Sequence, residues 1–230
     1  MKRFYKQVAV EASDTGYIIT LDERPVKTPG KMRQVLPTAL LAEAIAVEWA
    51  EQSDVIDPRT MHLTRLANTA IDRVKARKAE VVDEVTAFGG SDLLCYREGE
   101  QQKLVAMQKK LWDPFLDWAR DALGAELETT ESILHVAQAP TSLSALRAAV
   151  DSCDAFSLTA LHALTTGFGS LVLGLAHVQG AYTLEAVWQA ANLDYNYQMI
   201  VWGEDAEAKA TQDILYTDMQ AASRFLGMLT

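Results

Sequence analysis

The hydrophobic pattern changes its period near residue 37, and this change limits the possible folds more than any other feature. Residues 4–10 alternate with a period of two, and residues 17–21 form a second strand-like run after Asp14, Thr15 and Gly16, which predict a turn. Residues 24–28 and 33–36, separated by Pro29-Gly30, resemble two more strands. We therefore predict a small antiparallel sheet at the N-terminus.

Beyond Pro37 the apolar spacing is helical, and Thr38 is a suitable N-cap for the first helix. Asp113-Pro114 and Thr183 with Glu185 are typical of helix starts. The fold class is therefore α+β, with a small antiparallel β-rich domain at residues 1–55 and a larger, mostly α-helical, orthogonal bundle-like domain at 56–230. Helices are expected near 38–52, 58–75, 77–89, 99–123, 142–152, 155–178, 183–202 and 205–227, and an extra strand at 131–137.

Composition and charge favour a protein of the cytoplasm. The net charge of -10 disfavours nucleic acid as a partner, although residues 1–40 carry a local balance of +3, from seven basic against four acidic residues. Cys95 and Cys153 are predicted to be reduced thiols, and the basic N-terminus lacks the apolar stretch of a signal peptide. Residues 155–184 contain no charged side chain, but polar residues and two glycines interrupt them, so we expect buried helices and no membrane insertion.

The stretch 57–74 combines an ordinary apolar helical stripe with unusual polar residues. A generic solvated face would use interchangeable Glu and Lys, whereas this stretch contains Thr and Asn, which are mediocre helix formers. The choice indicates fixed hydrogen bonds to a neighbouring segment. We predict that Arg65, Asn68 and Asp72 form a structural network.

Motifs for catalysis or cofactor binding are weak. The four histidines and two cysteines share no ligand spacing, so neither a metal nor another cofactor is expected. A phosphate-binding GK[ST] loop and a GxSxG elbow are both absent from the sequence. Asp92, Cys95 and Arg97 could be imagined as a catalytic cluster, but Cys95 has no obvious base nearby in sequence and is expected to face the core. We predict no catalytic residues.

Seven segments, in order, resemble one family: the assembly chaperones for the alpha subunit of the catalytic head (the F-one sector) of ATP synthase, which in eukaryotes act in the mitochondrial matrix. They are RFYK at 3–6, LDERPVKTP at 21–29, LTRLANTAIDRV at 63–74, SDLLCYR at 91–97, the set Gln108, Trp112, Asp113, Pro114 and Trp118, YQ at 197–198, and WGEDAEA at 202–208. The flanking segment LAEAIAVEWAEQ at 41–52 also fits the resemblance. Two departures are visible: His62 replaces a usual Pro, and Asp194 with Tyr195 replaces a usual pair of Glu residues.

The resemblance implies a monomeric, ATP-independent chaperone that binds the unassembled alpha subunit and shields its interface until the beta subunit replaces it. It also places client handling near an acidic residue followed by the YQ pair. Asp194 and Gln198 lie one helical turn apart beside an aromatic stripe that includes Trp188, Tyr195 and Trp202. We predict partner binding by Asp194, Gln198 and Tyr195, with Trp188 and Trp202 assigned to the core. The alternative is a small-molecule enzyme that uses Asp92 and Arg97 beside a helical core pocket.

Overall fold

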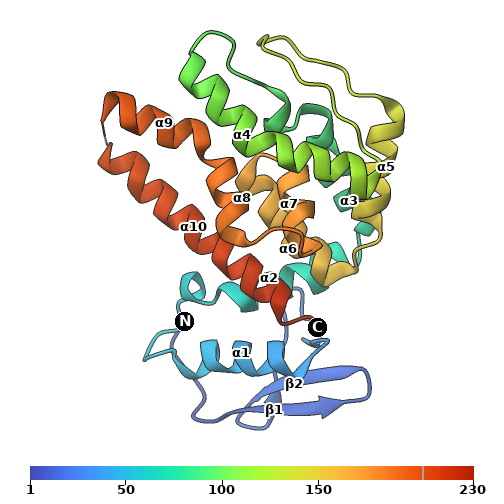
Figure 1. Cartoon of the computed structure of the whole chain (residues 1–230). Coiled ribbons are helices and arrows are strands. Elements are labelled where there is room, and N and C mark those ends of the chain that lie inside the picture. The colour runs from blue at the N-terminus through green and yellow to red at the C-terminus, as the bar shows by residue number, and fades with distance from the viewer. Residues whose placement is uncertain (204) are drawn as a thin grey trace. The chain divides into compact units, whose positions relative to one another are not determined.

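The computed structural model describes residues 1–203 and 205–230, and it confirms the α+β class (Figure 1). The contacts divide the chain into two compact units. Unit 1 comprises Met1–Lys78, Asp154–Ala160 and Ala221–Thr230, and unit 2 comprises Ala79–Cys153 and Leu161–Gln220. The predicted domain boundary after residue 55 stays a prediction; the first compact unit has a different extent, because it continues to Lys78 and includes two later segments.

Unit 1 is built on a three-stranded antiparallel sheet in the order β1-β2-β3. β1 (Val8–Ser13) pairs with β2 (Gly16–Leu21), and β2 pairs with β3 (Arg24–Pro25). Gly16 has φ of +148°, and a Cβ there would collide with the carbonyl of Leu36, so the hairpin requires glycine. The predicted strands 24–28 and 33–36 are too long, because only the pair at 24–25 is regular and Lys27, Arg33 and Leu36 form isolated bridges.

Helix α1 (Ala39–Ala50) begins after Thr38, whose hydroxyl accepts a hydrogen bond from the amide of Leu41 as predicted for an N-cap. A short 3-10 turn, η1 (Pro58–Thr60), leads into α2 (His62–Thr69), which continues as a π-helical turn, η2 (Ala70–Val74). The buried core of unit 1 contains side chains from the sheet, α1, α2 and two later segments, among them Ile19, Leu36, Leu41, Ile45, Leu63, Ala67, Ala160 and Phe225.

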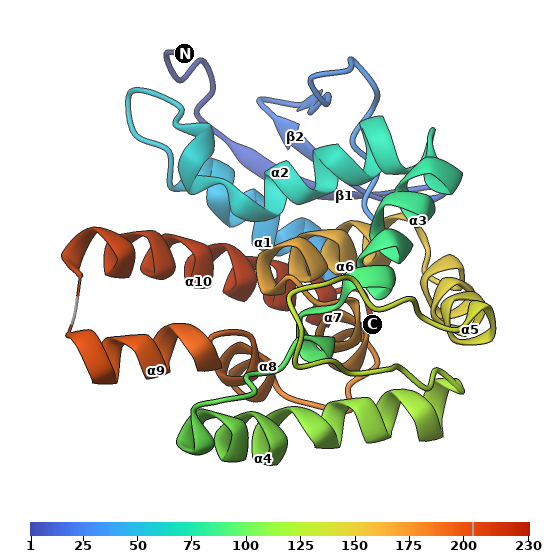
Figure 2. The same cartoon turned by 90° about the horizontal axis from the view of Figure 1, so that it is seen from above.

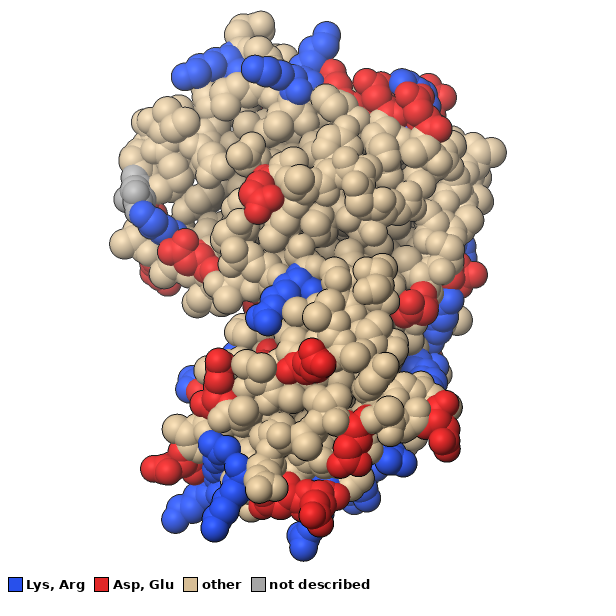
Figure 3. Space-filling view, turned by 60° about the horizontal axis from the view of Figure 1, so that its bottom comes forward, with Lys and Arg blue, Asp and Glu red and all other residues tan. Residues whose placement is uncertain are grey.

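The surface of unit 1 mixes both signs of charge. Figure 3 shows Lys and Arg side chains interspersed with Asp and Glu over the β1, β2 and α1 part of the chain. The local excess of +3 at residues 1–40 is therefore not concentrated in one continuous basic patch on this face.

Unit 2 is helical. Its helices are α3 (Lys78–Ala87), which starts at the last residue of unit 1, α4 (Gln102–Trp118) with a π-helical end η5 (Ala119–Leu123), α5 (Pro140–Asp151), α7 (Leu171–Val178), α8 (Leu184–Ala191) and α9 (Leu193–Trp202). The 3-10 turns η3 (Phe88–Ser91) and η4 (Leu93–Cys95) follow α3. Both units contribute to α6 (Ala155–Phe168) and α10 (Ala206–Gly227).

Helix α4 contacts α7 and α9, and Figure 2 shows it along one side of the helical layer. Its Trp112 is fully buried, and the indole N–H donates to the carbonyl of Ala190 over 2.8 Å. Asp113 and Pro114 lie inside α4, so the helix start predicted there is wrong. The Thr183 start is confirmed, because its hydroxyl accepts from the amide of Ala186.

Two predicted helices are each divided. The segment predicted as one helix at 155–178 breaks at Gly169, which has φ of +66°, and at Ser170, which caps α7. The segment predicted at 183–202 breaks at Asn192 between α8 and α9. The strand expected at 131–137 is not formed; Thr130 makes only an isolated bridge with Tyr96.

Candidate functional site

A pocket of about 460 Å³ lies between α4 and α9 within unit 2. We call it the α4–α9 pocket. α9 contributes Asp194 and Gln198, which are one turn apart and therefore lie on the same side of the helix. The remaining lining residues are Tyr96, Arg97, Glu98, Gln101, Leu104, Gln108, Glu131, Ser132, Ile133, Tyr197, Val201 and Trp202. The structure thus brings two of the three predicted partner-binding residues to one pocket.

The side chain of Gln108 joins the two helices. It is almost fully buried, and its amide nitrogen donates to Asp194 Oδ1 over 2.8 Å. Its Oε1 accepts from the backbone amide of Glu98, also over 2.8 Å. The carboxylate of Asp194 is consequently held in a fixed orientation, half-buried rather than fully exposed as a helical surface residue would be.

Arg97 forms one wall of the pocket and is packed against residues outside it. Its Nε donates to the carbonyl of Leu94 over 2.7 Å, and its Nη2 lies 3.1 Å from Asp113 Oδ1. The guanidinium also lies over the ring of Trp112, 5.1 Å from the ring centroid. Burial lowers the pKa of Arg97, and the neighbouring carboxylate of Asp113 opposes that change. Arg97 is therefore a packed, ion-paired residue.

The exposed rim of the α4–α9 pocket includes three large apolar side chains among polar ones. Ile133 is 100% exposed, Trp202 is 75% exposed and Val201 is 51% exposed. The assignment of Trp202 to the core is wrong, because this residue is the last of α9 and projects into solvent. Exposed large apolar side chains beside a polar pocket are typical of surfaces that bind other proteins.

Tyr195 lies in a different place from Asp194 and Gln198. It lines a second pocket of about 310 Å³ with residues of α8, α9 and α10, including Trp188, Met199 and Tyr216. The rings of Trp188 and Tyr216 are 4.8 Å apart, and Trp188 is half-buried. The three residues predicted to bind a partner are therefore divided between two neighbouring faces of α9.

Arg65, Asn68 and Asp72 lie in unit 1, on α2 and η2. Asp72 accepts a hydrogen bond from the hydroxyl of Thr28 over 2.5 Å and another from the amide of Gly30 over 2.8 Å. Asn68 accepts from the side chain of Gln34 over 2.9 Å. These bonds join the helix to the loop between residues 28 and 34.

Arg65 contacts a residue of its own helix. It is exposed, and its Nη2 lies 3.3 Å from Nδ1 of His62 on the same helix. The structure therefore brings Asn68 and Asp72 to one loop, and Arg65 contacts His62 on its own helix. The structural role of the three residues stays a prediction.

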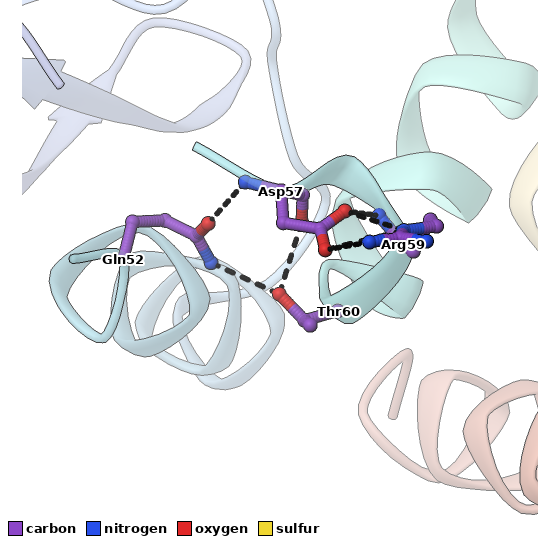
Figure 4. Close-up of polar contacts among 4 residues, drawn as sticks. All are labelled: Gln52, Asp57, Arg59 and Thr60. Carbon is purple, nitrogen blue, oxygen red and sulfur yellow. Dashed lines mark hydrogen bonds and ion pairs between the residues drawn. The ribbon is translucent and has the colours of Figure 1, made fainter. Parts of the chain in front are cut away.

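The start of α2 is stabilised by side chains from α1 and the preceding turn. The carboxylate of Glu48 accepts from the amides of Leu63 and Thr64, each over 2.8 Å. Figure 4 shows the turn before the helix, where Gln52 accepts from the amide of Asp57 over 2.7 Å and donates to the hydroxyl of Thr60. His62 at the first helical position is thus tolerated without a proline.

Asp57 and Arg59 form an exposed pair in the same turn, with Arg59 Nη2 2.8 Å from Asp57 Oδ2 (Figure 4). Hydrogen bonds from the side chain and the backbone amide of Arg59 lower the pKa of Asp57 from 3.8 to about 2. The pair belongs to the turn and is remote in sequence from the pocket residues.

Asp92 has a structural explanation. It is fully buried and accepts hydrogen bonds from the hydroxyl of Ser170 over 2.7 Å and from the amides of Val172 and Leu94. Burial raises the pKa of Asp92, and these hydrogen bonds partly offset the increase. Its contacts cap α7 and the η4 turn, so Asp92 is a poor candidate for acid–base chemistry on a substrate.

Cys95 is also buried, as predicted, and burial is the main reason why its pKa rises to about 12. A thiol with so high a pKa is a weak nucleophile at neutral pH. Over residues 1–203 and 205–230, the structure has no cluster of three or more potential metal ligands and no helix long and apolar enough to cross a membrane.

Several site residues had no sequence signal that tied them together. Gln108 is 86 residues from Asp194, and Glu98, Glu131 and Ile133 lie in turns or irregular segments. Only the resemblance singled out Gln108. Hydrophobic periodicity carries no information about which irregular segment lies beside a given helix.

Comparisons with known proteins agree with this architecture. A profile of the ATP12 chaperone protein family matches residues 2–120. The chain is 26% identical over 227 residues to the mitochondrial protein atp12 of Schizosaccharomyces pombe, covering 93% of this chain and 78% of that one.

Relatives of known structure have a higher sequence identity to this chain. Atp12 from Paracoccus denitrificans is 41% identical, with a TM-score of 0.95, covering 100% of this chain and 98% of that one. An aspartate-to-lysine mutant of the same protein matches equally well. A protein from Agrobacterium tumefaciens is 39% identical, with a TM-score of 0.95 and coverage of 100% and 86%. The chain therefore belongs to the ATP12 chaperone family, whose members assist assembly of the ATP synthase catalytic head and are not enzymes.

Proposed function

We propose that this chaperone binds the unassembled alpha subunit of the ATP synthase catalytic head and masks the surface that later contacts the beta subunit. Family membership is the observation that carries the proposal. An orphan subunit of a permanent complex exposes a large apolar interface and is prone to aggregate. Occupying that interface would prevent aggregation without any use of ATP.

We assign the client surface to the α4–α9 pocket and its rim. The rim supplies exposed apolar area through Ile133, Val201 and Trp202, which is the chemistry that an uncovered subunit interface would match. The pocket supplies polar groups through Asp194 and Gln198, which would fix the register of the client. Tyr195, on the neighbouring face of α9, would extend the contact.

The charge of this region supports a client with a basic or donor-rich surface. Between Glu185 and Asp218 the sequence contains seven acidic residues and a single basic residue, Lys209. Such a field accelerates encounter with a complementary surface and weakens as salt is added. It also leaves the complex reversible, which a temporary cap requires.

The test is suppression of alpha-subunit aggregation, measured by light scattering after dilution of the alpha subunit from denaturant. Equimolar chaperone should suppress scattering, and Trp202→Ala should suppress it much less, because the side chain is 75% exposed on the rim. Ile214→Ala is the matched control, since Ile214 is 67% exposed on α10 and lines neither pocket. No suppression by the wild-type protein would contradict the proposal, and equal effects of both substitutions would contradict the assignment of the surface.

A further inference from the structure

The α4–α9 pocket is lined by more acidic than basic residues. Its charged lining residues are three acids, Glu98, Glu131 and Asp194, and one base, Arg97. The guanidinium of Arg97 is paired with Asp113, which is not part of the lining, and it also interacts electrostatically with Asp194. A cationic group entering the pocket would therefore meet carboxylates whose charge is only partly compensated.

Two of these carboxylates are held in place by hydrogen bonds from the chain. Asp194 Oδ1 accepts from Gln108, and Glu98 Oε1 accepts from the amides of Glu100 and Gln101. Each contact uses one oxygen, whereas an ionised carboxylate has two. The second oxygen of Asp194 can accept from a ligand without breaking the hydrogen bond from Gln108.

Part of the pocket wall is apolar or aromatic. Leu104 and Tyr197 are buried, whereas Val201, Trp202 and Ile133 are exposed at the rim. An aliphatic stem can pack along such walls while its charged end reaches the acids. A planar cation can in addition stack on an aromatic ring. The volume of about 460 Å³ falls in the range of ligand-binding pockets, roughly 300–1,000 Å³.

We propose that the α4–α9 pocket receives one arginine side chain of the client, while apolar neighbours of that arginine pack on Ile133, Val201 and Trp202. This inference rests on the proposed function and deepens it by naming the chemistry of the client segment. Charge complementarity selects a base, and the fork of donors on a guanidinium fits several fixed acceptors better than the compact ammonium of lysine does. Gln108 acts as a positioning residue, because it orients Asp194 through its own amide.

The experiment is an NMR titration of the full-length protein with three capped pentapeptides, Gly-Leu-Xaa-Leu-Gly, in which Xaa is arginine, its neutral isostere citrulline, or lysine. The signals followed are the side-chain amides of Gln108 and Gln198 and the indole N–H of Trp202. The arginine peptide should shift these signals saturably, and the citrulline peptide should bind about tenfold more weakly, as expected for the loss of charge-assisted hydrogen bonds.

Asp194→Asn should weaken binding of the arginine peptide about tenfold while keeping the Oδ1 acceptor for Gln108. Asp213→Asn is the control, because it makes the same change of charge at an exposed residue that lines the second pocket. This control should leave the affinity nearly unchanged.

The inference would be overturned by equal binding of the citrulline peptide, by tighter binding of the lysine peptide, by equal losses in both variants, or by the absence of shifts at these three residues. Failure of this kind is distinguishable from failure of the proposed function. If the wild-type protein suppresses aggregation of the alpha subunit but binds no peptide, only the inference about arginine fails. If it binds the arginine peptide but does not suppress this aggregation, only the proposed function fails.

Discussion

Replacement of Asp72 by alanine tests the link between η2 and the loop at residues 28–34. The substitution removes the acceptor for the hydroxyl of Thr28 and for the amide of Gly30. Hydrogen bonds to a charged group contribute about 1.5–3 kcal/mol each. The Asp72 side chain is half-buried, so water replaces part of the loss, and the Thr28 hydroxyl can turn toward the carbonyl of Met32 at 3.4 Å. We therefore expect a loss of about 2 kcal/mol in the free energy of unfolding.

For a chain of this size, a loss of about 2 kcal/mol corresponds to a decrease of roughly 4–8 °C in the melting temperature. Calorimetry or circular dichroism measures it directly, with Asp54→Ala as the control because Asp54 is an exposed acid of the same unit. The control should melt within about 1 °C of the wild type, as surface substitutions usually do. An unchanged midpoint for Asp72→Ala together with lost client binding would refute the structural role and make these residues part of the recognition surface.

Four further outcomes are expected. Calorimetric titration with ATP and magnesium should be flat, because the sequence lacks a phosphate-binding loop and the net charge is -10; micromolar binding would revive the enzyme alternative. Asp194→Lys should weaken capture of the alpha subunit but should also destabilise the fold by about 1–2 kcal/mol, because it removes the acceptor of Gln108. Gln198 is exposed, so Gln198→Lys should weaken capture of the alpha subunit with little change in the melting temperature. Full suppression of alpha-subunit aggregation by this folded variant would remove α9 from the recognition surface. Finally, the carboxyl carbon of Asp57 should titrate near pH 2 in the wild type and at a higher pH in Arg59→Ala, which keeps only the backbone hydrogen bond of residue 59. The pair therefore adds stability above pH 4 that is lost as the pH falls toward 2, and equal midpoints would contradict this assignment.

The periodic parts of the fold were predictable because a helix buries one stripe and needs a start signal. For α1, the apolar stripe that begins at Leu40 and Leu41 and the Thr38 cap predicted a helix at 38–52. The observed ends lie within two residues of these bounds. Residues 33–36 were predicted as a strand, but Arg33 and Leu36 form only isolated bridges. A β-rich composition does not show how many residues of a segment pair with a neighbouring strand. Pro114 was misplaced for a related reason: Asp-Pro favours a first turn, but packing of α4 on α7 and α9 keeps it in the interior.

The pocket could be only partly anticipated. Asp194 and Gln198 share a helix face by spacing alone, and the resemblance drew attention to that helix. The partnership of Asp194 with Gln108 depends on the packing of α4 against α9, which no local pattern encodes. Trp202 was assigned to the core by its place in the aromatic stripe, although it lies at the very end of α9 and is exposed. The enzyme alternative rested on the closeness of Asp92 and Arg97 in the sequence. In the structure, the carboxylate of Asp92 accepts hydrogen bonds that cap α7.

The central claim is that the chaperone occupies the surface of the alpha subunit that the beta subunit later takes. The most direct measurement is native mass spectrometry of the purified chaperone with the alpha subunit, before and after addition of the beta subunit. The account predicts a one-to-one complex of chaperone and alpha subunit, which beta subunit converts to an alpha–beta complex and free chaperone. A stable ternary complex of chaperone, alpha and beta subunits would contradict it, because the two proteins would then occupy different surfaces.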